Sequence, residues 1–439
     1  MKDEGGGLME GIKPERLTEL SDERKTLLLS RSMTDISEVY DYVRGIVQKV
    51  RDQGDPYILD NHRELKKNLS LTDLRVGKRE IQEAYGKVDK SVQSALKTAA
   101  RNIQCFHQAQ REREMWSVEV RQGVLAGRLI RPISAAGVYI PGGQANYPSS
   151  ALMNIIPAKV AGVKQVVACT PPRKGMKINP VTLVAMDMAG ADRIFKVGGP
   201  WAVAGMAYGT GSIPKVDKIV GPGNKYVTAA KMAVFGVVDI DSPAGPSEAL
   251  IIADETARAD WLVWDFLSQI EHDADAGAVL VTPSLELARE VCRRINQELP
   301  GVKRKEMVSG ALSRHSAVLI SRDIQAAVDF SNAYAPEHLQ IVTRDPWTIL
   351  PQIQHAASIF LGPYAPVPAG DYASGTNHVL PTGGCARMFS GLSVDDFIKK
   401  PTFQYLSKNG LQGLKKTITV LAEEEGLPLH ARTVTERFK

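Results

Sequence analysis

An alternation of short β-branched runs with helical segments, beginning at about Gly127, restricts the fold more than any other feature of the chain. In its first part, strands are predicted at residues 137–140, 165–169, 193–197 and 218–220. Helices are predicted at 149–160 and 180–188, and two more are predicted, one ending at Met206 and one beginning at Asn224. Such alternation is typical of βαβ units, in which parallel strands carry helices on both faces of a sheet. This part is therefore predicted to be an α/β domain of nucleotide-binding size.

A second α/β segment follows, and helical sequence lies at both ends of the chain. Strands are predicted at 249–253, 278–281, 317–320 and 359–361, with helices at 257–272, up to Gln297 and at 323–333. Residues 1–115 and the tail after Gly391 have mostly helical periodicity. A chain of 439 residues is too long for one ordinary core, so two or three domains are predicted.

Glycine-rich turns follow three of the predicted strands in the first α/β part. They are Pro141-Gly142-Gly143, Gly198-Gly199-Pro200 and Gly221-Pro222-Gly223-Asn224. In open parallel sheets, ligands bind outside the carboxyl ends of the strands, and glycine lets the backbone approach them closely. The GxGxxG fingerprint is absent, and each glycine pair alone is more often an ordinary tight turn. Three such turns at three strand ends nevertheless indicate a cofactor site.

Composition excludes several classes of function. Lys and Arg exceed Asp and Glu by 54 − 49 = 5 and are spread along the chain, so no nucleic-acid partner is predicted. No stretch approaches the ~20 apolar residues of a membrane span, and the N-terminus has no apolar leader segment. The cysteines are too far apart for a disulfide framework or a thiolate zinc site, which fits a reducing cytoplasm: Cys105, Cys169, Cys292 and Cys385.

A glycine-punctuated loop is predicted at residues 369–381, between two apolar segments, and it carries Asp371 and His378. Irregular backbone between ordered elements is where binding and catalytic groups tend to lie. The alternative is a turn with an Asx cap and a surface histidine. The residues of this loop alone do not decide between the two.

Four side chains in the sequence are candidate metal ligands. Gln269 and His272 share one helix face through their i, i+3 spacing, Asp371 adds a carboxylate, and His430 adds a second imidazole. Two imidazoles with oxygen donors and no thiolate suit Zn²⁺. His430 lies on the tail and can come from the same chain or from a partner's. Because glutamine is a rare ligand, a polar helix face is the alternative for the pair.

The dipeptide Glu337-His338 offers a carboxylate and an imidazole beside each other at a helix end. A histidine titrates near neutral pH, and a glutamate can act as a base where burial raises its proton affinity. Adjacent side chains in a loop point in different directions, so the pair can serve two different steps. The alternative is a capped loop with one exposed histidine.

Taken together, these stretches resemble the histidinol dehydrogenase family over nearly the whole chain apart from its N-terminal end. The motifs are residues 138–143 with 147–150, 218–224, 244–248, 269–272, 335–339 and 370–381, in that order. So many long motifs in one order make a chance similarity very unlikely. The family reaction oxidises a primary amino alcohol through an aldehyde to a carboxylate with two NAD⁺ and one water.

Carried over by position, the resemblance implies roles for individual residues. It implies zinc ligands at Gln269, His272, Asp371 and His430, the last from the partner subunit, and proton transfer by Glu337 and His338. It implies substrate contacts at Ser247, His378 and Glu425, together with His338 and the four metal ligands. It implies NAD contacts at Tyr139 and Asn224, and Trp201 stands at a further NAD position.

The resemblance also implies an α/β fold of two incomplete Rossmann-like domains with parallel-sheet cores. Residues 1–32 are expected to be a helical N-terminal segment, and 33–138 with 247–391 a larger domain that carries the metal and catalytic residues. Residues 139–246 are expected to form an inserted NAD-binding domain. Residues 392–439 are expected to be a helical tail that contributes to the partner's active site, so that a homodimer shares its two sites.

Two departures from the family pattern keep other functions open. Trp201 stands where the family usually has Gln, and Val367 where a Glu usually precedes the Gly-Asp-Tyr run. An indole cannot copy the hydrogen bonds of an amide. The leading hypothesis is oxidation of L-histidinol to L-histidine, the last step of histidine biosynthesis. The rivals are a zinc- and NAD-dependent dehydrogenase of another small primary alcohol, and a catalytically idle binding or regulatory protein on the same fold.

Overall fold

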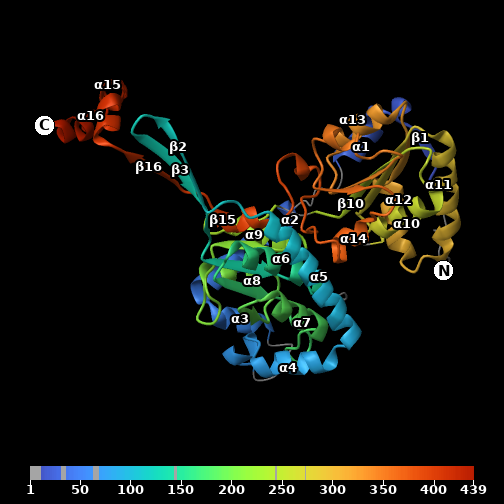
Figure 1. Ribbon diagram of the computed structural model, residues 1–439. Coiled ribbons are helices and arrows are strands. Elements are labelled where there is room, and N and C mark those ends of the chain that lie inside the picture. The colour runs from blue at the N-terminus through green and yellow to red at the C-terminus, as the bar shows by residue number, and fades with distance from the viewer. Residues whose placement is uncertain (1–10, 31–35, 63–68, 143–145, 243–244, 272) are drawn as a thin grey trace.

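The larger of two parallel sheets has six strands in the order β1-β12-β11-β10-β13-β14 (Figure 1). This computed structural model describes residues 11–30, 36–62, 69–142, 146–242, 245–271 and 273–439. The strands are β1 Pro14–Arg16, β10 Glu248–Ala253, β11 Gly277–Thr282, β12 Ala317–Ile320, β13 His338–Val342 and β14 Ser358–Leu361. Every residue of β10, β11 and β13 is buried, as expected where helices cover both faces of a parallel sheet.

Helices cover the two faces of this sheet in separate groups. One face packs on α10 (Ala259–Ile270), α11 (Leu285–Glu298) and α12 (Lys305–His315), and their apolar residues form one core cluster with the strands. The other face packs on α1 (Asp22–Ser30) and α13 (Ile324–Tyr334). The helices and strands that were predicted in this part agree with the observed ones to within a few residues, because their apolar periodicity is local. Helix α12 and strand β13 were not predicted, and His338, which was expected in a loop, begins the buried strand β13.

The smaller parallel sheet has five strands in the order β7-β6-β5-β8-β9. The strands are β5 Ala135–Tyr139, β6 Gln165–Cys169, β7 Arg193–Phe195, β8 Lys218–Val220 and β9 Asp239–Ile240. The chain runs from β5 outward to β7 and then returns to β8 on the other side of β5. The strand order therefore reverses between β5 and β8, which is where such sheets bind ligands at their carboxyl ends.

The faces of this sheet are covered by helices that precede it in the chain and by helices that connect its strands. The first face packs on α4 (Lys78–Lys87), α5 (Lys90–Ala109), α6 (Pro148–Ala161) and α7 (Pro180–Ala189). The second packs on α2 (Ser37–Gln53), α3 (Asp55–His62), α8 (Gly199–Tyr208) and α9 (Lys225–Val234). Among the described residues, no helix combines the length and the apolar character that a membrane span requires.

The grouping of the N-terminal residues differs from the expected domain boundaries. We expected residues 33–138 to belong with 247–391, but α2 to α5 share their cores with the smaller sheet. Within the expected N-terminal segment 1–32, described residues 14–16 form β1, which pairs with β12 at the edge of the larger sheet. Helices α2 and α5 are amphipathic along one stripe, and that pattern does not specify which sheet the stripe covers.

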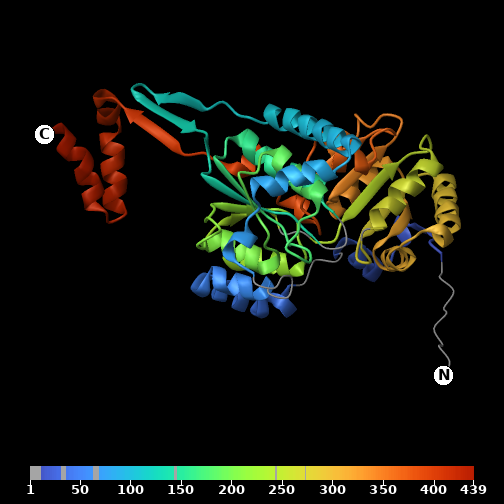
Figure 2. The same cartoon turned by 90° about the horizontal axis from the view of Figure 1, so that it is seen from below.

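An arm extends from the body of the molecule and carries the C-terminus (Figures 1 and 2). Its base is a three-stranded antiparallel sheet of β2 (Met115–Arg121), β3 (Val124–Leu129) and β16 (Thr402–Leu406), and its tip is α15 (Lys408–Glu424) with α16 (Pro428–Thr435). A short bridge of β15 (Ile398–Lys399) and β4 (Arg131–Pro132) connects the arm to the body. The tail after residue 391 is thus partly strand, although only helix was predicted there.

Candidate active site

Three of the site residues predicted from the sequence lie at the amino-terminal ends of two neighbouring strands of the larger sheet. Ser247 directly precedes β10, and Glu337 directly precedes β13, which begins at His338. The two strands pair in parallel with Ala249 opposite His338, so the three side chains emerge beside one another. This edge is opposite to the carboxyl edge at which open parallel sheets usually bind ligands.

A chain of hydrogen bonds connects Gln269 of α10 to Glu337. Gln269 Nε2 donates to Ser247 Oγ over 2.7 Å, and Ser247 Oγ donates to Glu337 Oε2 over 2.8 Å. The backbone N–H of Glu248 donates to the same carboxylate oxygen over 2.9 Å. Because the serine proton goes to the carboxylate, the serine oxygen must accept from the amide, which orients Gln269. Its carbonyl oxygen Oε1 is then the atom available as a ligand.

His338 has the environment of a neutral base. Its Nδ1 lies 3.1 Å from the backbone oxygen of Glu248, so Nδ1 carries the proton and donates to that carbonyl. Its Nε2 is buried without a hydrogen-bond partner among the described residues and lies 3.8 Å from Asp371 Oδ1. Burial lowers the pKa of His338 below its ordinary value, and the Asp371 carboxylate opposes this shift. The unprotonated Nε2 is therefore ready to accept a proton.

Asp371 lies on a short helix, α14 (Val367–Tyr372), and not in a loop as its glycine-rich surroundings predicted. The loop begins only after this helix. His378 in the loop donates from Nδ1 to the backbone oxygen of Asp371 over 3.0 Å, and its Nε2 lies 3.4 Å from Ser150 Oγ on α6. Burial lowers the pKa of His378 to about 4, so it is neutral at pH 7. His378 is partly buried, which disfavours the alternative of a surface histidine.

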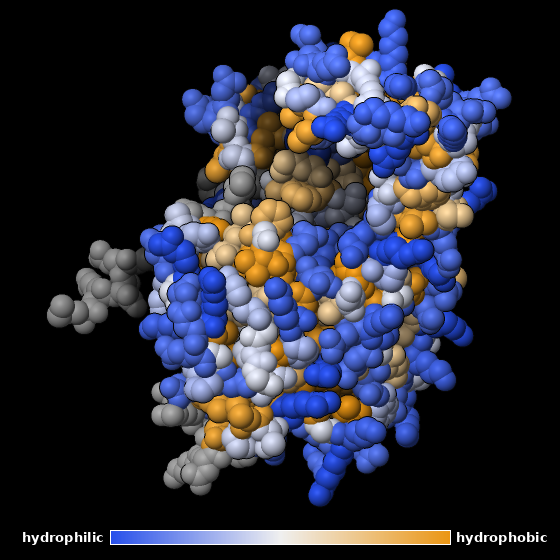
Figure 3. Space-filling view, turned by 90° about the vertical axis from the view of Figure 1, so that its left-hand side faces the viewer, coloured by the Kyte–Doolittle hydropathy of each residue, from blue (hydrophilic) through white to orange (hydrophobic). Residues whose placement is uncertain are grey.

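The loop after α14 is held by contacts with helices of the other sheet. Asn377 donates from Nδ2 to the backbone oxygen of Met153 on α6 over 2.7 Å, and the same nitrogen lies 3.3 Å from His107 Nε2 on α5. Gly375 has φ +109°, and a Cβ there would lie 2.7 Å from the backbone oxygen of Asn102. The site thus lies where the two sheet domains meet, and Figure 3 shows a hollow in the surface between them.

The donor set in one chain fits a divalent cation but is incomplete. Gln269 presents an amide oxygen and Asp371 a carboxylate, and both types suit Zn²⁺ or a similar ion. His338 Nε2, which is buried without a hydrogen-bond partner among the described residues, lies 3.8 Å from Asp371 Oδ1 and adds a nitrogen donor beside the carboxylate. His272 lies outside the described residues. Among the described residues, no group of three or more His, Cys, Asp or Glu side chains is arranged to hold a metal.

The two remaining residues that were predicted to bind metal or substrate lie on the arm. His430 is on α16 and Glu425 is at the carboxyl end of α15, and both side chains are exposed. The arm points away from the body, so neither residue is near the site of its own chain (Figures 1 and 2). On the face of the molecule drawn in Figure 3, apolar side chains lie among hydrophilic ones. The single chain therefore places these two residues apart from the other predicted ligands.

Two of the three predicted NAD residues lie at the reversal point of the smaller sheet. Tyr139 ends β5, and its hydroxyl accepts from the backbone N–H of Gly199 over 3.1 Å. Asn224 caps α9 by accepting from Tyr226 N over 3.1 Å and Val227 N over 3.2 Å. Trp201, in contrast, packs on the apolar core between the smaller sheet and α2, and its indole Nε1 is buried without a partner among the described residues.

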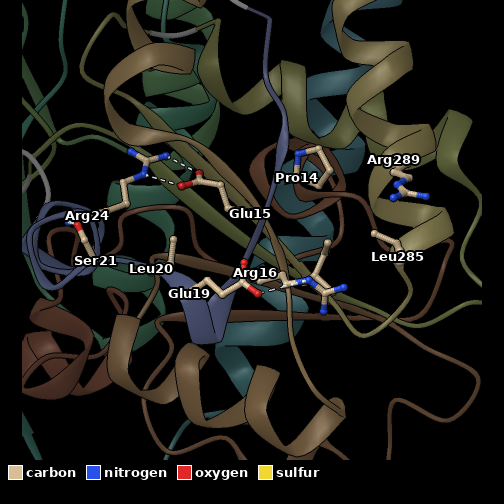
Figure 4. Close-up of a pocket in the computed structure, with 10 residues that line it drawn as sticks. Pro14, Glu15, Arg16, Glu19, Leu20, Ser21, Arg24, Leu285 and Arg289 are labelled. Carbon is tan, nitrogen blue, oxygen red and sulfur yellow. Dashed lines mark hydrogen bonds and ion pairs between the residues drawn. The ribbon is translucent and has the colours of Figure 1, made fainter.

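A pocket of about 550 Å³ lies away from these residues, beside β1 and α11 (Figure 4). It is lined by Arg16, Arg24 and Arg289 among others. Arg24 is bound to Glu15 at 2.9 Å, and Arg16 lies 3.7 Å from Glu19. Two of its three positive charges are thus accompanied by carboxylates, and we assign this pocket no role in the chemistry.

Comparisons with known proteins agree in one assignment. The family model described as histidinol dehydrogenase matches residues 29–438. The histidinol dehydrogenase of Methanothermobacter thermautotrophicus is 50% identical over 427 residues, covering 97% of this chain and 99% of the relative, and that of Bacillus anthracis is 47% identical over 415 residues, covering 94% and 96%. The chain belongs to the histidinol dehydrogenase family.

The fold agrees with that of a solved family member. The crystal structure of histidinol dehydrogenase from Elizabethkingia anophelis matches with a TM-score of 0.91 and 39% identity, covering 95% of this chain and 96% of that one. The predicted family, the α/β fold with parallel sheets and the enzyme class, an NAD-dependent oxidoreductase, are thereby confirmed. The rival of an idle binding protein has no support from these matches.

For this member of the histidinol dehydrogenase family, the structure adds residues that the sequence did not reveal. Glu248 binds the backbone N–H of Glu337 through Oε1 at 3.2 Å and supplies the carbonyl that orients His338. Ser150 approaches His378 from α6. Both residues belong to motifs that carried the resemblance, but only the pairing of β10 with β13 and the packing of α6 bring them to the site.

Proposed function

We propose that the chain oxidises L-histidinol to L-histidine, as the last step of histidine biosynthesis, in two NAD-linked steps at a zinc site. The observation that carries this proposal is the buried, unprotonated Nε2 of His338 beside Asp371, next to the Gln269, Ser247 and Glu337 chain. In sum, an alcohol, two NAD⁺ and one water give a carboxylate, two NADH and three protons. Both steps need a base, and the site offers two.

In the first step, His338 Nε2 removes the hydroxyl proton as a hydride leaves the carbinol carbon. A neutral imidazole within hydrogen-bond reach is a suitable base near neutral pH. Bound Zn²⁺, held by Gln269, His272, Asp371 and the partner's His430, would act as a Lewis acid on the substrate oxygen. The family position and the loop contact of His378 support a substrate contact for its imidazole.

In the second step, Glu337 removes a proton from the water that adds to the aldehyde. The gem-diol formed in this way loses a second hydride and becomes the carboxylate. Many aldehyde-oxidising enzymes use a cysteine for this purpose, but no cysteine of this chain takes part in the hydrogen-bond chain described above. Burial raises the pKa of the Cys292 thiol to about 12 and also raises that of Cys169, which makes both poor nucleophiles.

We further propose a cytoplasmic homodimer in which each arm completes the partner's site with His430 and Glu425. The exposed apolar residues of the arm support this, because a monomer rarely leaves so many uncovered. They include Trp116 at 46% exposure and Leu429 at 72%. All residues of β2 are exposed. The arm thus has the composition of a surface covered by another chain.

One observation favours a relative that acts on another small alcohol. Val367 begins α14, is 4% exposed and replaces the carboxylate usual at this position. A buried valine next to the Asp371 helix cannot hold a cationic group. The retained Glu425 and His378 favour histidinol.

The test is an assay of the purified chain with Zn²⁺, NAD⁺ and L-histidinol that counts NADH per substrate. Two equivalents are expected from this function. Turnover with other primary alcohols and none with histidinol would assign the rival activity. The absence of turnover on every alcohol would contradict catalysis by this chain.

A further inference from the structure

A buried ion pair lies at the carboxyl end of β8, outside the site described above. Lys231 of α9 and Asp241, which directly follows β9, have side-chain exposures of 3% and 6% and contact each other. Burial raises the pKa of the Asp241 carboxyl, and Lys231 opposes that rise. Such a pair loses hydration and is often no more stabilising than apolar residues of the same volume. Its stability contribution alone therefore gives no reason for its presence.

The pair holds both peptide groups of Gly221. The Gly221 N–H donates to Asp241 Oδ2 over 2.7 Å, and Lys231 Nζ donates to the Gly221 carbonyl over 3.1 Å. Gly221 has φ +120°, and a Cβ there would lie 2.1 Å from the Tyr139 carbonyl oxygen. The two charged groups thus fix a glycine in close contact with the end of β5.

This glycine lies at the point where the strand order of the smaller sheet reverses. β5 and β8 are neighbours there, and their carboxyl ends carry Tyr139 and the loop from Gly221 to Asn224. Asn224 already uses its side-chain oxygen to cap α9, so the far end of the loop is fixed by its own helix. The near end is fixed by Lys231 and Asp241. Open parallel sheets bind ligands in a crevice at such a reversal of strand order, so the position of Gly221 bears on the shape of a ligand site there.

We propose that Lys231 and Asp241 are positioning residues for NAD⁺, which hold Gly221 so that the crevice between β5 and β8 fits the cofactor. This inference rests on the proposed function, because it requires that NAD⁺ binds at this crevice. Apolar residues could fill the same space, but they would leave the N–H and C=O groups of Gly221 without their charged partners.

The test compares stability and NADH affinity in single and double variants. Lys231→Met leaves a lone buried carboxylate and should lower the melting temperature and weaken NADH binding, measured by fluorescence titration, by about tenfold, as for one lost charge-assisted hydrogen bond. Lys231→Met/Asp241→Leu removes both charges and should recover melting temperature while the Kd for NADH stays about tenfold raised. Recovery of both quantities in the double variant would show a purely structural pair and overturn the proposal.

A matched control lies at the other end of the same strand. Lys218 begins β8, is 8% exposed and contacts Asp239 at 3.0 Å and Asp396 at 3.2 Å. Lys218→Met should lower the melting temperature without changing the Kd for NADH, and an equal loss of affinity would also overturn the proposal. If the wild-type chain binds no NADH, the proposed function fails. If it binds NADH and the Lys231 and Asp241 variants bind equally well, only this inference fails.

Discussion

At the scale of single residues, the two proposed bases of the site have different surroundings. His338 is oriented through Nδ1 by a carbonyl and leaves Nε2 without a partner among the described residues, whereas Glu337 accepts from Ser247 and from a backbone N–H. Groups in such different environments can perform different steps of one reaction. The sequence shows the two residues as neighbours, but it does not show this division.

Glu337→Gln should separate the two oxidations. The amide oxygen of Gln can still accept from Ser247 and Glu248 N, so the fold should persist, but an amide cannot remove a proton from water. We expect aldehyde oxidation to slow by roughly 10²- to 10⁴-fold and alcohol oxidation to slow much less. Single-turnover measurements of NADH from the alcohol and from the aldehyde intermediate test this, and equal losses in both would contradict it.

At the scale of secondary-structure elements, the site depends on contacts between helices of one sheet and a loop of the other. His107 on α5 is fully buried, with Nδ1 2.7 Å from Gln110 Oε1 and Nε2 3.3 Å from Asn377 Nδ2. Asn377 in turn binds α6. The loop that carries His378 is therefore fixed by α5 and α6, although these helices lie more than 200 positions earlier in the chain.

His107 should make stability depend on pH. Burial lowers the pKa of His107 below the ordinary 6.5, so the folded state disfavours the charged form of this imidazole. The contribution of neutral His107 to the free energy of unfolding is fully present above pH ~6.5 and is lost as the pH falls toward the lowered pKa. In that range the free energy of unfolding falls by up to about 1.4 kcal/mol per pH unit. Denaturant unfolding of wild type and His107→Gln between pH 7 and 5 should show a smaller slope in the variant.

His62 provides the matched control for this prediction. It is also buried, its pKa is also lowered by burial, and among the described residues its ring binds the Ile58 carbonyl of its own helix. His62→Gln should reduce the pH slope in the same direction without affecting turnover at pH 7. His107→Gln should in addition lower turnover, because the loop loses an anchor. An unchanged slope in both variants would contradict the effect of burial.

At the scale of the whole molecule, the body of one chain holds only part of the proposed site. Gln269, Asp371 and the two bases lie together in the body, whereas His430 and Glu425 lie on the extended arm. Two copies related by a twofold axis would exchange arms reciprocally, since a C2 interface uses the same surface on both subunits. We therefore expect activity to depend on dimer formation.

Subunit mixing tests whether His430 acts in the partner's site. Glu337→Gln and His430→Ala should each abolish conversion of histidinol to histidine. After denaturation and refolding together in equal amounts, a mixed dimer contains one site with both residues intact, so about one quarter of the wild-type activity should return. If His430 acts within its own chain, no activity returns. Refolding of each variant alone is the control.

The sequence by itself determined the family and the alternation of strands and helices, and it supplied the residues of the proposed site, because these depend on local periodicity and short motifs. Tertiary structure decided which elements meet. β3 pairs with β16 across more than 270 residues, β1 joins β12, and α2 to α5 cover the smaller sheet, none of which has a local signal. Burial by these long-range contacts also decided that His338 and His378 are neutral and that Lys231 and Asp241 hold Gly221.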